Sequence, residues 1–325
     1  MVLRQRFLAA ASASVLVLAV RPGITRADDL PLVRVGTAQA VSLAFLPIQV
    51  GEAAGIWRQA GIRVESSALR GDAQVQQALA SDSIDIGLGS GPGLGFLAKG
   101  VPAIGIAALA GSPYNMALMV PLNSPINSAA DLKGKRIGVT TAGSLTDWLT
   151  KQIAVEQGWD STVIATVPLG DTKAQVAAMK TNEIDGFIAG TELGYDLQER
   201  QQAKVIMTFG TIVKHFVTHV IFARNDMVAD HPDLVKKFLI GWFRSVAYMR
   251  SHRAESITIA AKYEGVSESS MGKSYDAIMG MMSSDGAWNN AALDEIASSL
   301  VDLKILDTKP NPETLITRKF VPVHI

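Results

Sequence analysis

Cysteine is absent from the 325 residues of this chain. Its absence excludes disulfide bonds, a thiol nucleophile and cysteine-ligated metal sites, and it leaves no cysteine near the N-terminus to carry a lipid. Charged residues are also few, at 18%, against 48% hydrophobic residues. This balance is typical of a compact globular protein, and a chain of this length is expected to form two lobes rather than one core.

The first 27 residues have the layout of a Sec signal peptide. Arg4 and Arg6 precede an uncharged stretch of 14 residues, 7–20, and Thr25-Arg26-Ala27 places small residues at positions −3 and −1 of a cut after residue 27. A helix needs roughly 20 apolar residues to span a bilayer. We therefore predict cleavage and a periplasmic destination; an uncleaved anchor and a cytosolic leader are the alternatives.

No basic run is present that would indicate a polyanionic partner. Removal of residues 1–27 takes away four arginines and no acid, which leaves 26 basic and 30 acidic side chains and a formal charge of −4. A mildly acidic chain lacks the electrostatic footprint of a nucleic-acid binder, and no basic amphipathic segment favours a membrane surface. Neither partner is expected.

Short β-rich apolar runs alternate with helical stretches from residue 32 to residue 210, which predicts a doubly wound α/β fold. The chain then adds one more strand and a mostly helical tail, whose first long helix has a start signal at Asp230-His231-Pro232-Asp233. The predicted strands are residues 33–37, 84–89, 103–109, 136–140, 184–189, 204–209 and 217–224. The predicted helices before the tail include residues 47–60, 73–81, 145–156 and 173–181.

The second half of this pattern repeats the first. Arg34-Val35-Gly36, followed after five residues by Ser42-Leu43, recurs 102 positions later as Arg136-Ile137-Gly138 and Ser144-Leu145. Gly71-Asp72, a helix and Ile84-Asp85 recur as Gly170-Asp171, a helix and Ile184-Asp185. Two matches in the same order at similar offsets predict two similar lobes of about 100 residues.

These stretches resemble the solute-binding proteins of nitrate, sulfonate and taurine ABC importers, which in turn resemble thiamine-pyrimidine precursor proteins. The residues that carry the resemblance are 33–47, 53–57 with 61–65, 78–89 and 131–139. It implies a type II periplasmic-binding fold, in which two α/β lobes close on a cleft about crossovers near residues 113–116 and 215–218. The lobes are then residues 28–113 joined with 227–325, and residues 114–226.

Ligands of open parallel sheets bind beyond the carboxyl ends of the strands, so the loops that follow the strands are the candidate site. Serines at the starts of equivalent helices could bind a ligand or simply cap the helix. The glycine-rich run at residues 87–93 fits neither a phosphate loop nor a nucleophile elbow, and a plain strand-to-helix turn is its alternative. The predicted ligand-binding residues are Gln39, Ser42, Phe45, Ser90, Gly91, Gly143, Ser144, Thr146, Thr191, Glu192 and His215.

Other polar and aromatic residues have simpler structural roles as alternatives to ligand binding. Asp171 could meet a ligand or only cap a helix. His215 and His219 are unsuited to one shared metal, because in a strand four residues span roughly 13 Å. Tyr114, Trp148 and Tyr195 could line a cleft, although aromatic residues more often belong to the core.

Together these features predict a monomeric binding protein that passes a small solute to an ABC importer permease, with no catalytic residues, cofactor or metal. An organic sulfonate or similar small anion is the first expectation for the solute, because helix N-termini favour anions. A binding protein for a neutral heterocycle, an enzyme of the thiamine-pyrimidine precursor type and a sensor module are the alternatives.

Overall fold

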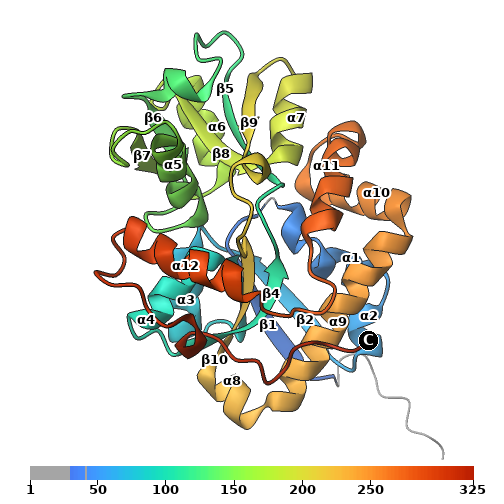
Figure 1. Cartoon of the computed structure of the whole chain (residues 1–325). Helices are drawn as coiled ribbons and strands as arrows, with labels where there is room; N and C mark the ends of the chain where they lie inside the picture. The colour runs from blue at the N-terminus through green and yellow to red at the C-terminus, as the bar shows by residue number, and fades with distance from the viewer. Residues whose placement is uncertain (1–29, 41) are drawn as a thin grey trace, which may run out of the picture.

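The computed structural model describes residues 30–40 and 42–325, and the predicted signal peptide lies outside the described residues. Two five-stranded sheets lie one above the other, with helices packed around each (Figure 1). The predicted α/β class with two sheets is confirmed.

The first sheet has the strand order β2-β1-β3-β10-β4. Its strands β1, β2 and β3 are mutually parallel where they pair, whereas β10 runs antiparallel between β3 and β4. Central β3 is fully buried and β1 is mostly buried, as expected for strands covered on both faces. The bounds are β1 Leu32–Thr37, β2 Arg63–Ala68, β3 Ile86–Ser90, β4 Ala103–Ala110 and β10 His219–Arg224.

The second sheet repeats this plan in the order β7-β6-β8-β5-β9. Here β6 pairs in parallel with β7 and β8, and the antiparallel strand between β8 and β9 is β5. The bounds are β5 Met116–Pro121, β6 Arg136–Val139, β7 Ala165–Pro168, β8 Gly186–Gly190 and β9 Ala203–Thr208. The sequence analysis missed β2, β5 and β7, two of which are partly exposed edge strands with a weak apolar signal.

Helices connect and cover the strands. The predicted helix 47–60 is two helices, because Gly55 adopts the left-handed conformation at φ 68° and interrupts it. The bounds are α1 Pro47–Ala53, α2 Ile56–Gln59, α3 Asp72–Ala80, α4 Leu94–Ala98, α5 Leu145–Glu156, α6 Thr172–Lys180, α7 Thr191–Glu199, α8 Asn225–Asp230, α9 Pro232–Ser251, α10 Arg253–Glu264, α11 Glu268–Met281 and α12 Asn290–Asp302. Short 3-10 turns are η2 Leu43–Phe45, η3 Gly91–Gly93, η4 Ala129–Leu132, η5 Phe209–Thr211 and η6 Pro312–Thr314.

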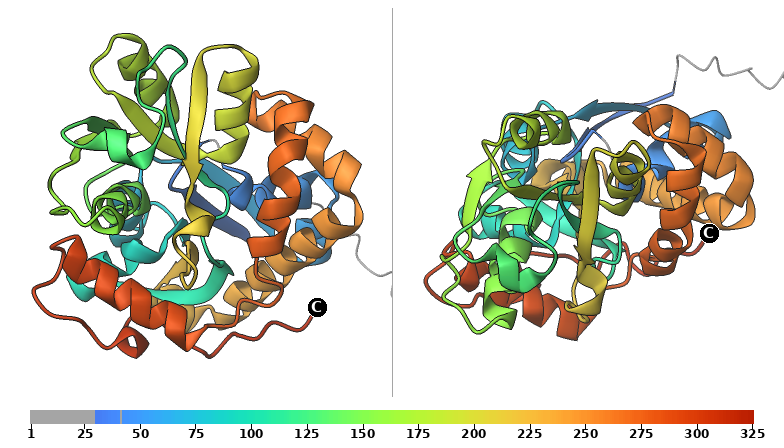
Figure 2. Two further views of the ribbon diagram at one scale, coloured as in Figure 1. Left: turned by 45° about the horizontal axis from the view of Figure 1, so that its top comes forward. Right: turned by 90° about the horizontal axis from the view of Figure 1, so that it is seen from above.

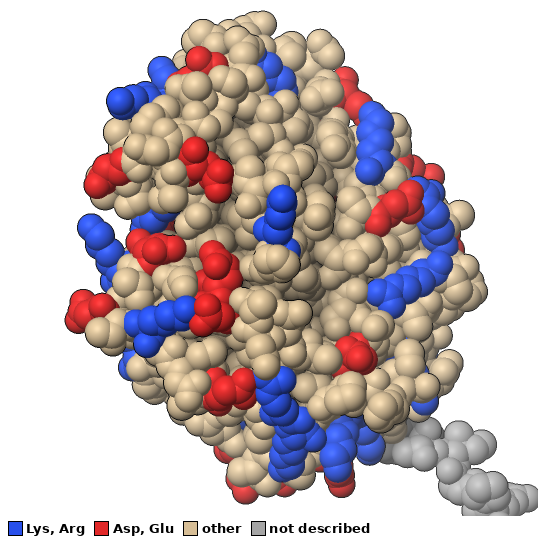
Figure 3. All heavy atoms as spheres, in the orientation of Figure 1, with Lys and Arg blue, Asp and Glu red and all other residues tan. Residues whose placement is uncertain are grey.

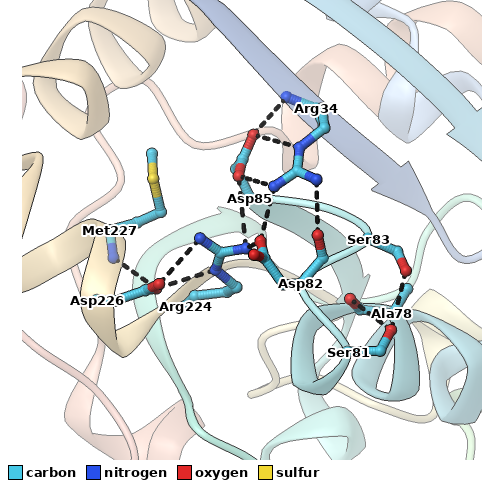
Figure 4. Close-up of polar contacts among 9 residues, drawn as sticks. All are labelled: Arg34, Ala78, Ser81, Asp82, Ser83, Asp85, Arg224, Asp226 and Met227. Atoms are coloured by element: carbon cyan, nitrogen blue, oxygen red, sulfur yellow. Dashed lines mark hydrogen bonds and ion pairs between the residues drawn. The ribbon is translucent and has the colours of Figure 1, made fainter.

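The sequence repeat corresponds to one ion-pair device at the start of each central parallel strand. Arg34 of β1 binds the Asp85 carboxylate through Nε at 3.1 Å and Nη2 at 2.6 Å (Figure 4), and Arg136 of β6 binds Asp185 through Nε at 3.1 Å. In the first sheet Arg224 of β10 joins the same cluster, where it contacts Asp82. These ion pairs lie at the amino ends of the parallel strands, away from the end where ligands bind. Their role is therefore to stabilise the fold.

The C-terminal helices return to the first sheet. Isolated bridges join Gly105 to Ile316 and Ala110 to Met282, both beside β4, and α9 and α10 pack on α1. We call the first sheet with these helices the first lobe, and the second sheet with α5, α6 and α7 the second lobe. Residues 219–224 were placed in the second lobe by the sequence, which is corrected here: β10 fills the gap between β3 and β4 of the first sheet.

The lobes also meet outside the sheets. Figure 2 shows α11 of the first lobe beside α7 of the second, and these two helices are in contact. On the face drawn in Figure 3, acidic and basic side chains are interspersed, without a large patch of one sign. Within the described part of the chain, no helix combines the length and the apolar character needed to cross a bilayer.

Candidate functional site

A small cavity of about 20 Å³ lies between the two lobes. It is bounded by the carboxyl ends of β1, β3 and β6 and by the first residues of β5 and β10, as expected for ligand sites of such sheets. A space of this size holds roughly one water molecule, so the lobes are closed more tightly than they would be around an organic solute. The lining residues are Ala38, Gln39, Phe45, Asp72, Gly89, Ser90, Met116, Thr140, Leu145, Thr146 and His219.

Asp72 bridges the two lobes at this cavity. Its buried carboxylate starts α3 and accepts hydrogen bonds from the Ser90 backbone N–H at 2.7 Å and the Ser90 hydroxyl at 2.8 Å. The backbone N–H of Leu145, the first residue of α5 in the second lobe, faces the same carboxylate and lowers its pKa. Burial raises the pKa of Asp72, and these hydrogen bonds oppose that rise. A protein carboxylate therefore occupies the positive end of α5.

His219 forms the floor of the cavity together with Phe45. The two rings meet edge to face with centroids 5.1 Å apart. His219 begins β10, and both its imidazole nitrogens are buried without a hydrogen-bond partner among the described residues. Burial lowers the pKa of His219 to about 4, so the ring is neutral at pH 7 and offers one donor and one acceptor.

The wall from the second lobe is a chain of hydroxyl groups at the start of α5. The Thr146 hydroxyl oxygen accepts from the Thr140 backbone N–H at 3.0 Å and lies 3.0 Å from the Ser144 hydroxyl. Ser144 itself accepts from the Asp147 backbone N–H at 3.4 Å and so caps the helix. Thr146 therefore lines the cavity, whereas Ser144 caps the helix.

Beside the cavity, at the seam between the lobes, lies a second group of buried polar side chains. The Leu43 backbone N–H of η2 donates to Glu192 Oε1 at 3.4 Å, and Glu264, the last residue of α10, is also buried. Asn115, just before β5, is fully buried with both amide atoms unpartnered in the described structure. Its backbone carbonyl accepts from the Thr191 backbone N–H at 2.8 Å, which places it beside the start of α7.

The predicted site residues fall into three groups. Gln39, Phe45, Ser90 and Thr146 line the cavity. Ser42, Thr191 and Glu192 lie at the seam. The others, Gly91, Gly143, Ser144 and His215, are absent from the cavity lining.

Each member of the third group has another environment. The Gly91 N–H donates to the Thr218 carbonyl at 3.2 Å, and the Gly143 N–H donates to Asp147 at 2.9 Å. His215 lines a separate hollow with Lys214 and Ser112. Ser42 has no side-chain cap hydrogen bond, unlike Ser144.

Of the other residues weighed, Asp171 caps α6 and pairs with Arg70 of the first lobe at 3.3 Å. Trp148 stacks on Phe216 at 4.4 Å in the core, and Tyr114 is exposed.

Five residues of the site were not predicted from the sequence: Asp72, Asn115, Thr140, His219 and Glu264. The repeated Gly-Asp pair could have drawn attention to Asp72, since its counterpart Asp171 was considered. Thr140 ends a predicted strand and so met the rule used for its neighbours. Asn115 and Glu264 carried no local signal, because only the packing of distant elements brings them to the seam.

Comparisons with known proteins identify the family of this chain and proteins of similar fold. The family model described as NMT1/THI5 like matches residues 42–256, more than half of the chain. The chain belongs to the NMT1/THI5-like family. The family resemblance inferred from the sequence is thereby confirmed.

Several proteins similar to this chain carry names that state a binding role. A Brucella abortus protein named as a binding protein is 26% identical over 260 residues, which cover 79% of this chain and 78% of that protein. The alkanesulfonate-binding protein of Xanthomonas axonopodis pv. citri, solved with bound MOPS, has a TM-score of 0.73 at 17% identity and covers 87% of this chain and 96% of its own. The periplasmic nitrate-binding protein of Synechocystis PCC 6803 has a TM-score of 0.70 at 15% identity, over 90% and 87% of the two chains. At these identities, the two solved structures establish a shared periplasmic-binding fold.

Proposed function

We propose that this NMT1/THI5-like protein captures a small solute between its lobes in the periplasm and delivers it to an ABC importer. The observation that carries the proposal is the cavity itself, because its lining comes from the carboxyl ends of strands in both sheets. A solute held there contacts both lobes only when they are closed, so its binding favours the closed state. The binding proteins of the same fold support this role.

The polar groups of the cavity favour binding over catalysis. Ser90, Asp72 and His219 are the residue types of a hydrolytic triad, but the Ser90 hydroxyl donates to Asp72 at 2.8 Å. Neither nitrogen of His219 has a hydrogen-bond partner within the described chain. A triad needs the histidine between the serine and the carboxylate, so these three residues do not form one.

For the solute, the lining favours an uncharged, hydrogen-bonding organic molecule over the small anion first expected. The lining contains no Lys or Arg, and it includes the Asp72 carboxylate. The Asp72 carboxylate already faces the N-terminus of α5, and Glu192 accepts from that of η2, where an anion would otherwise be held. Neutral His219 and the free amide of Asn115 offer both donors and acceptors.

A thermal-shift screen tests both parts of the proposal. The purified protein is heated with sulfonates (taurine, isethionate), nitrate, pyrimidines, flavins or amino acids at several concentrations. A true ligand at 100 times its Kd stabilises the folded state by about 2.7 kcal/mol, so its effect on Tm grows with concentration. We expect neutral heterocycles to raise Tm and anions to leave it unchanged.

The outcomes separate capture from solute class. A concentration-dependent shift with sulfonates alone would contradict the uncharged solute and leave capture standing. If a ligand is found, His219→Ala should weaken it; a ligand whose affinity is unaffected by His219→Ala, Asn115→Ala and Phe45→Ala would contradict binding in this cavity.

A further inference from the structure

The start of α7 carries a buried carboxyl group that the seam satisfies only in part. Glu192 is the second residue of α7, and its side chain is fully buried. Its Oε1 accepts from the Leu43 backbone N–H at 3.4 Å, whereas Oε2 has no hydrogen-bond partner among the described residues. A buried carboxyl oxygen without a donor is costly, so Oε2 is a natural contact for a molecule that enters the site.

The free oxygen lies on the side of the second sheet that faces the cavity. Gly190 ends β8 and pairs with Met116 of β5, and a Cβ added at Gly190 would lie 2.8 Å from Glu192 Oε2. Side chains of directly opposed residues in an antiparallel pair stand on the same face of the sheet. Oε2 therefore lies on the face that carries the Met116 side chain, and Met116 lines the cavity.

The bound oxygen connects the same carboxyl group to the first lobe. Leu43 begins η2, and Phe45, which ends this turn, lines the cavity. A 3-10 turn rises about 2 Å per residue, so these two residues are separated by about 4 Å along its axis. Glu192 is thus a neighbour of the cavity lining in both lobes, beside Met116 of the second and near Phe45 of the first.

Two more buried polar side chains without partners lie at this helix start. The Thr191 backbone N–H donates to the Asn115 carbonyl at 2.8 Å, which extends the pairing of Gly190 with Met116 by one position. The Thr191 hydroxyl and both amide atoms of Asn115 are buried and unpartnered within the part of the chain that the structure describes. Folded proteins leave few buried polar groups unpaired, so their concentration here indicates a place for a polar ligand.

The chemistry of Oε2 determines which group can bind there. An ionised carboxylate only accepts hydrogen bonds, so the ligand has to supply a donor. An anionic group would be repelled, and a carbonyl or ether oxygen would place one acceptor against another. A neutral –NH2 group supplies the donor without bringing a further charge into a buried site.

We propose that Glu192 selects a solute with a neutral –NH2 group, a primary carboxamide or an amino-substituted heterocycle, and accepts a hydrogen bond from it through Oε2. The inference rests on the proposed capture of a solute between the lobes and adds the chemical group that the solute presents to the second lobe. An organic solute exceeds the 20 Å³ cavity, so it extends past the lining to this neighbour. A site built to bind a donor rejects the analogue that lacks it, because the buried acceptor is then left unpaired.

Matched pairs of probes test this selection in the parent protein. Nicotinamide is compared with 3-acetylpyridine, and adenine with purine, because the members of each pair differ in one –NH2 group. Calorimetric titrations at pH 8 keep Glu192 ionised, above the pKa of about 7 to which burial raises it. We expect the –NH2 member of at least one pair to bind at least tenfold more tightly, as for a hydrogen bond to a charged group.

Glu192→Gln tests the carboxyl group directly. The Leu43 N–H keeps the side-chain oxygen on its own side, so the amide nitrogen of the variant takes the place of Oε2 and opposes the solute –NH2 as a second donor. The ratio of affinities within the pair should fall at least tenfold. Glu199→Gln, at the last residue of the same helix, is the matched control: it changes an ion pair with Lys273 outside the cavity, so both members of the pair are affected equally and the ratio stays as in the parent.

The outcomes separate this inference from capture itself. Equal affinities within every pair, or a ratio that survives in Glu192→Gln, would overturn the role of Glu192 and leave capture of another solute standing. If no –NH2 probe binds while a sulfonate or nitrate raises Tm in the thermal-shift screen, the inferred group is wrong and capture is retained. If neither the probes nor any solute of the screen binds, the inference and the proposed capture both fail.

Discussion

The surroundings of His219 keep its imidazole neutral and able to hydrogen-bond a solute. The residue is only 5% exposed, it packs on Phe45, and burial holds its pKa at about 4. A neutral imidazole with both nitrogens free can donate and accept at once. The same burial has a measurable consequence for folding, because the unfolded chain returns the histidine to water.

The stability of the protein should therefore fall on mild acidification, in part through His219. Unfolded His219 binds a proton below its ordinary pKa of 6.5, whereas folded His219 does not until about pH 4, so stability is lost as pH drops through this window. At pH 5 the loss from this group is about 2 kcal/mol relative to pH 7. Urea unfolding of His219→Gln at both pH values should show a loss smaller by this amount. The exposed His231→Gln serves as control, and equal losses in His219→Gln and the parent protein would refute the assignment.

At the scale of elements, the starts of η2 and α5 are equivalent in sequence and different in chemistry. Ser144 caps α5 with its own side chain, and the cavity side of that helix start is held by Asp72. Ser42 makes no such cap, and the Leu43 N–H of η2 is bound by Glu192 of the second lobe. In each lobe, a carboxylate from another part of the chain occupies a helix start.

This difference predicts unequal effects of two matched substitutions. Ser144→Ala should lower the free energy of unfolding by about 1 kcal/mol, the usual loss for a missing N-cap. Ser42→Ala should change it by less than about 0.5 kcal/mol, since no cap is removed. Urea denaturation of both variants makes the comparison; a larger loss for Ser42→Ala than for Ser144→Ala would be inconsistent with the geometry.

For the whole molecule, the closed state is also held by an external contact between lobes. Glu199 at the end of α7 accepts from the Ser267 hydroxyl at 2.7 Å, the Ser269 hydroxyl at 2.8 Å and Lys273 at 2.7 Å. The Lys273 ammonium, followed by the serine hydroxyls, lowers the pKa of Glu199 to about 2. This low pKa keeps the contact ionised at neutral pH.

Breaking the contact should weaken solute binding without touching the cavity. Glu199→Gln removes a charge that is stabilising only when the lobes are closed, and the apparent Kd rises as the closed fraction falls. Because the contact is partly exposed, the expected rise is roughly twofold to fivefold, and it should shrink at high salt. Calorimetric titration with the ligand from the thermal-shift screen measures it.

Asp276→Asn is the matched control, because its ion pair with Arg253 at 2.9 Å joins α10 and α11 within one lobe. Its Kd should equal that of the parent protein. An unchanged Kd in Glu199→Gln, or an equal rise in both variants, would show that the α7–α11 contact does not bias closure.

Much of the fold could be predicted because its signals are local. The buried strand runs 33–37, 103–109 and 184–189 and the helix 145–156 follow from apolar periodicity and from a serine cap. The repeated Arg-x-Gly and Ile-Asp motifs predicted two similar sheets. In the structure, the Arg and Asp of each repeat bind each other within their own lobe. Edge strands β2 and β7 were not predicted, because partial exposure leaves them with little apolar pattern.

The sequence by itself determined the absence of thiol chemistry, the duplicated α/β plan and the loops from which the site is drawn, because these depend on composition and on residues close together in the chain. Only the tertiary structure decided that Asp72 faces the start of α5 and that Glu192 binds the Leu43 N–H, since each contact joins different lobes. The polarity of the cavity, and with it the preferred solute, depends on those contacts. A carboxylate that lies at a helix start but belongs to a distant part of the chain cannot be predicted from the local sequence, because burial and proximity arise only on folding.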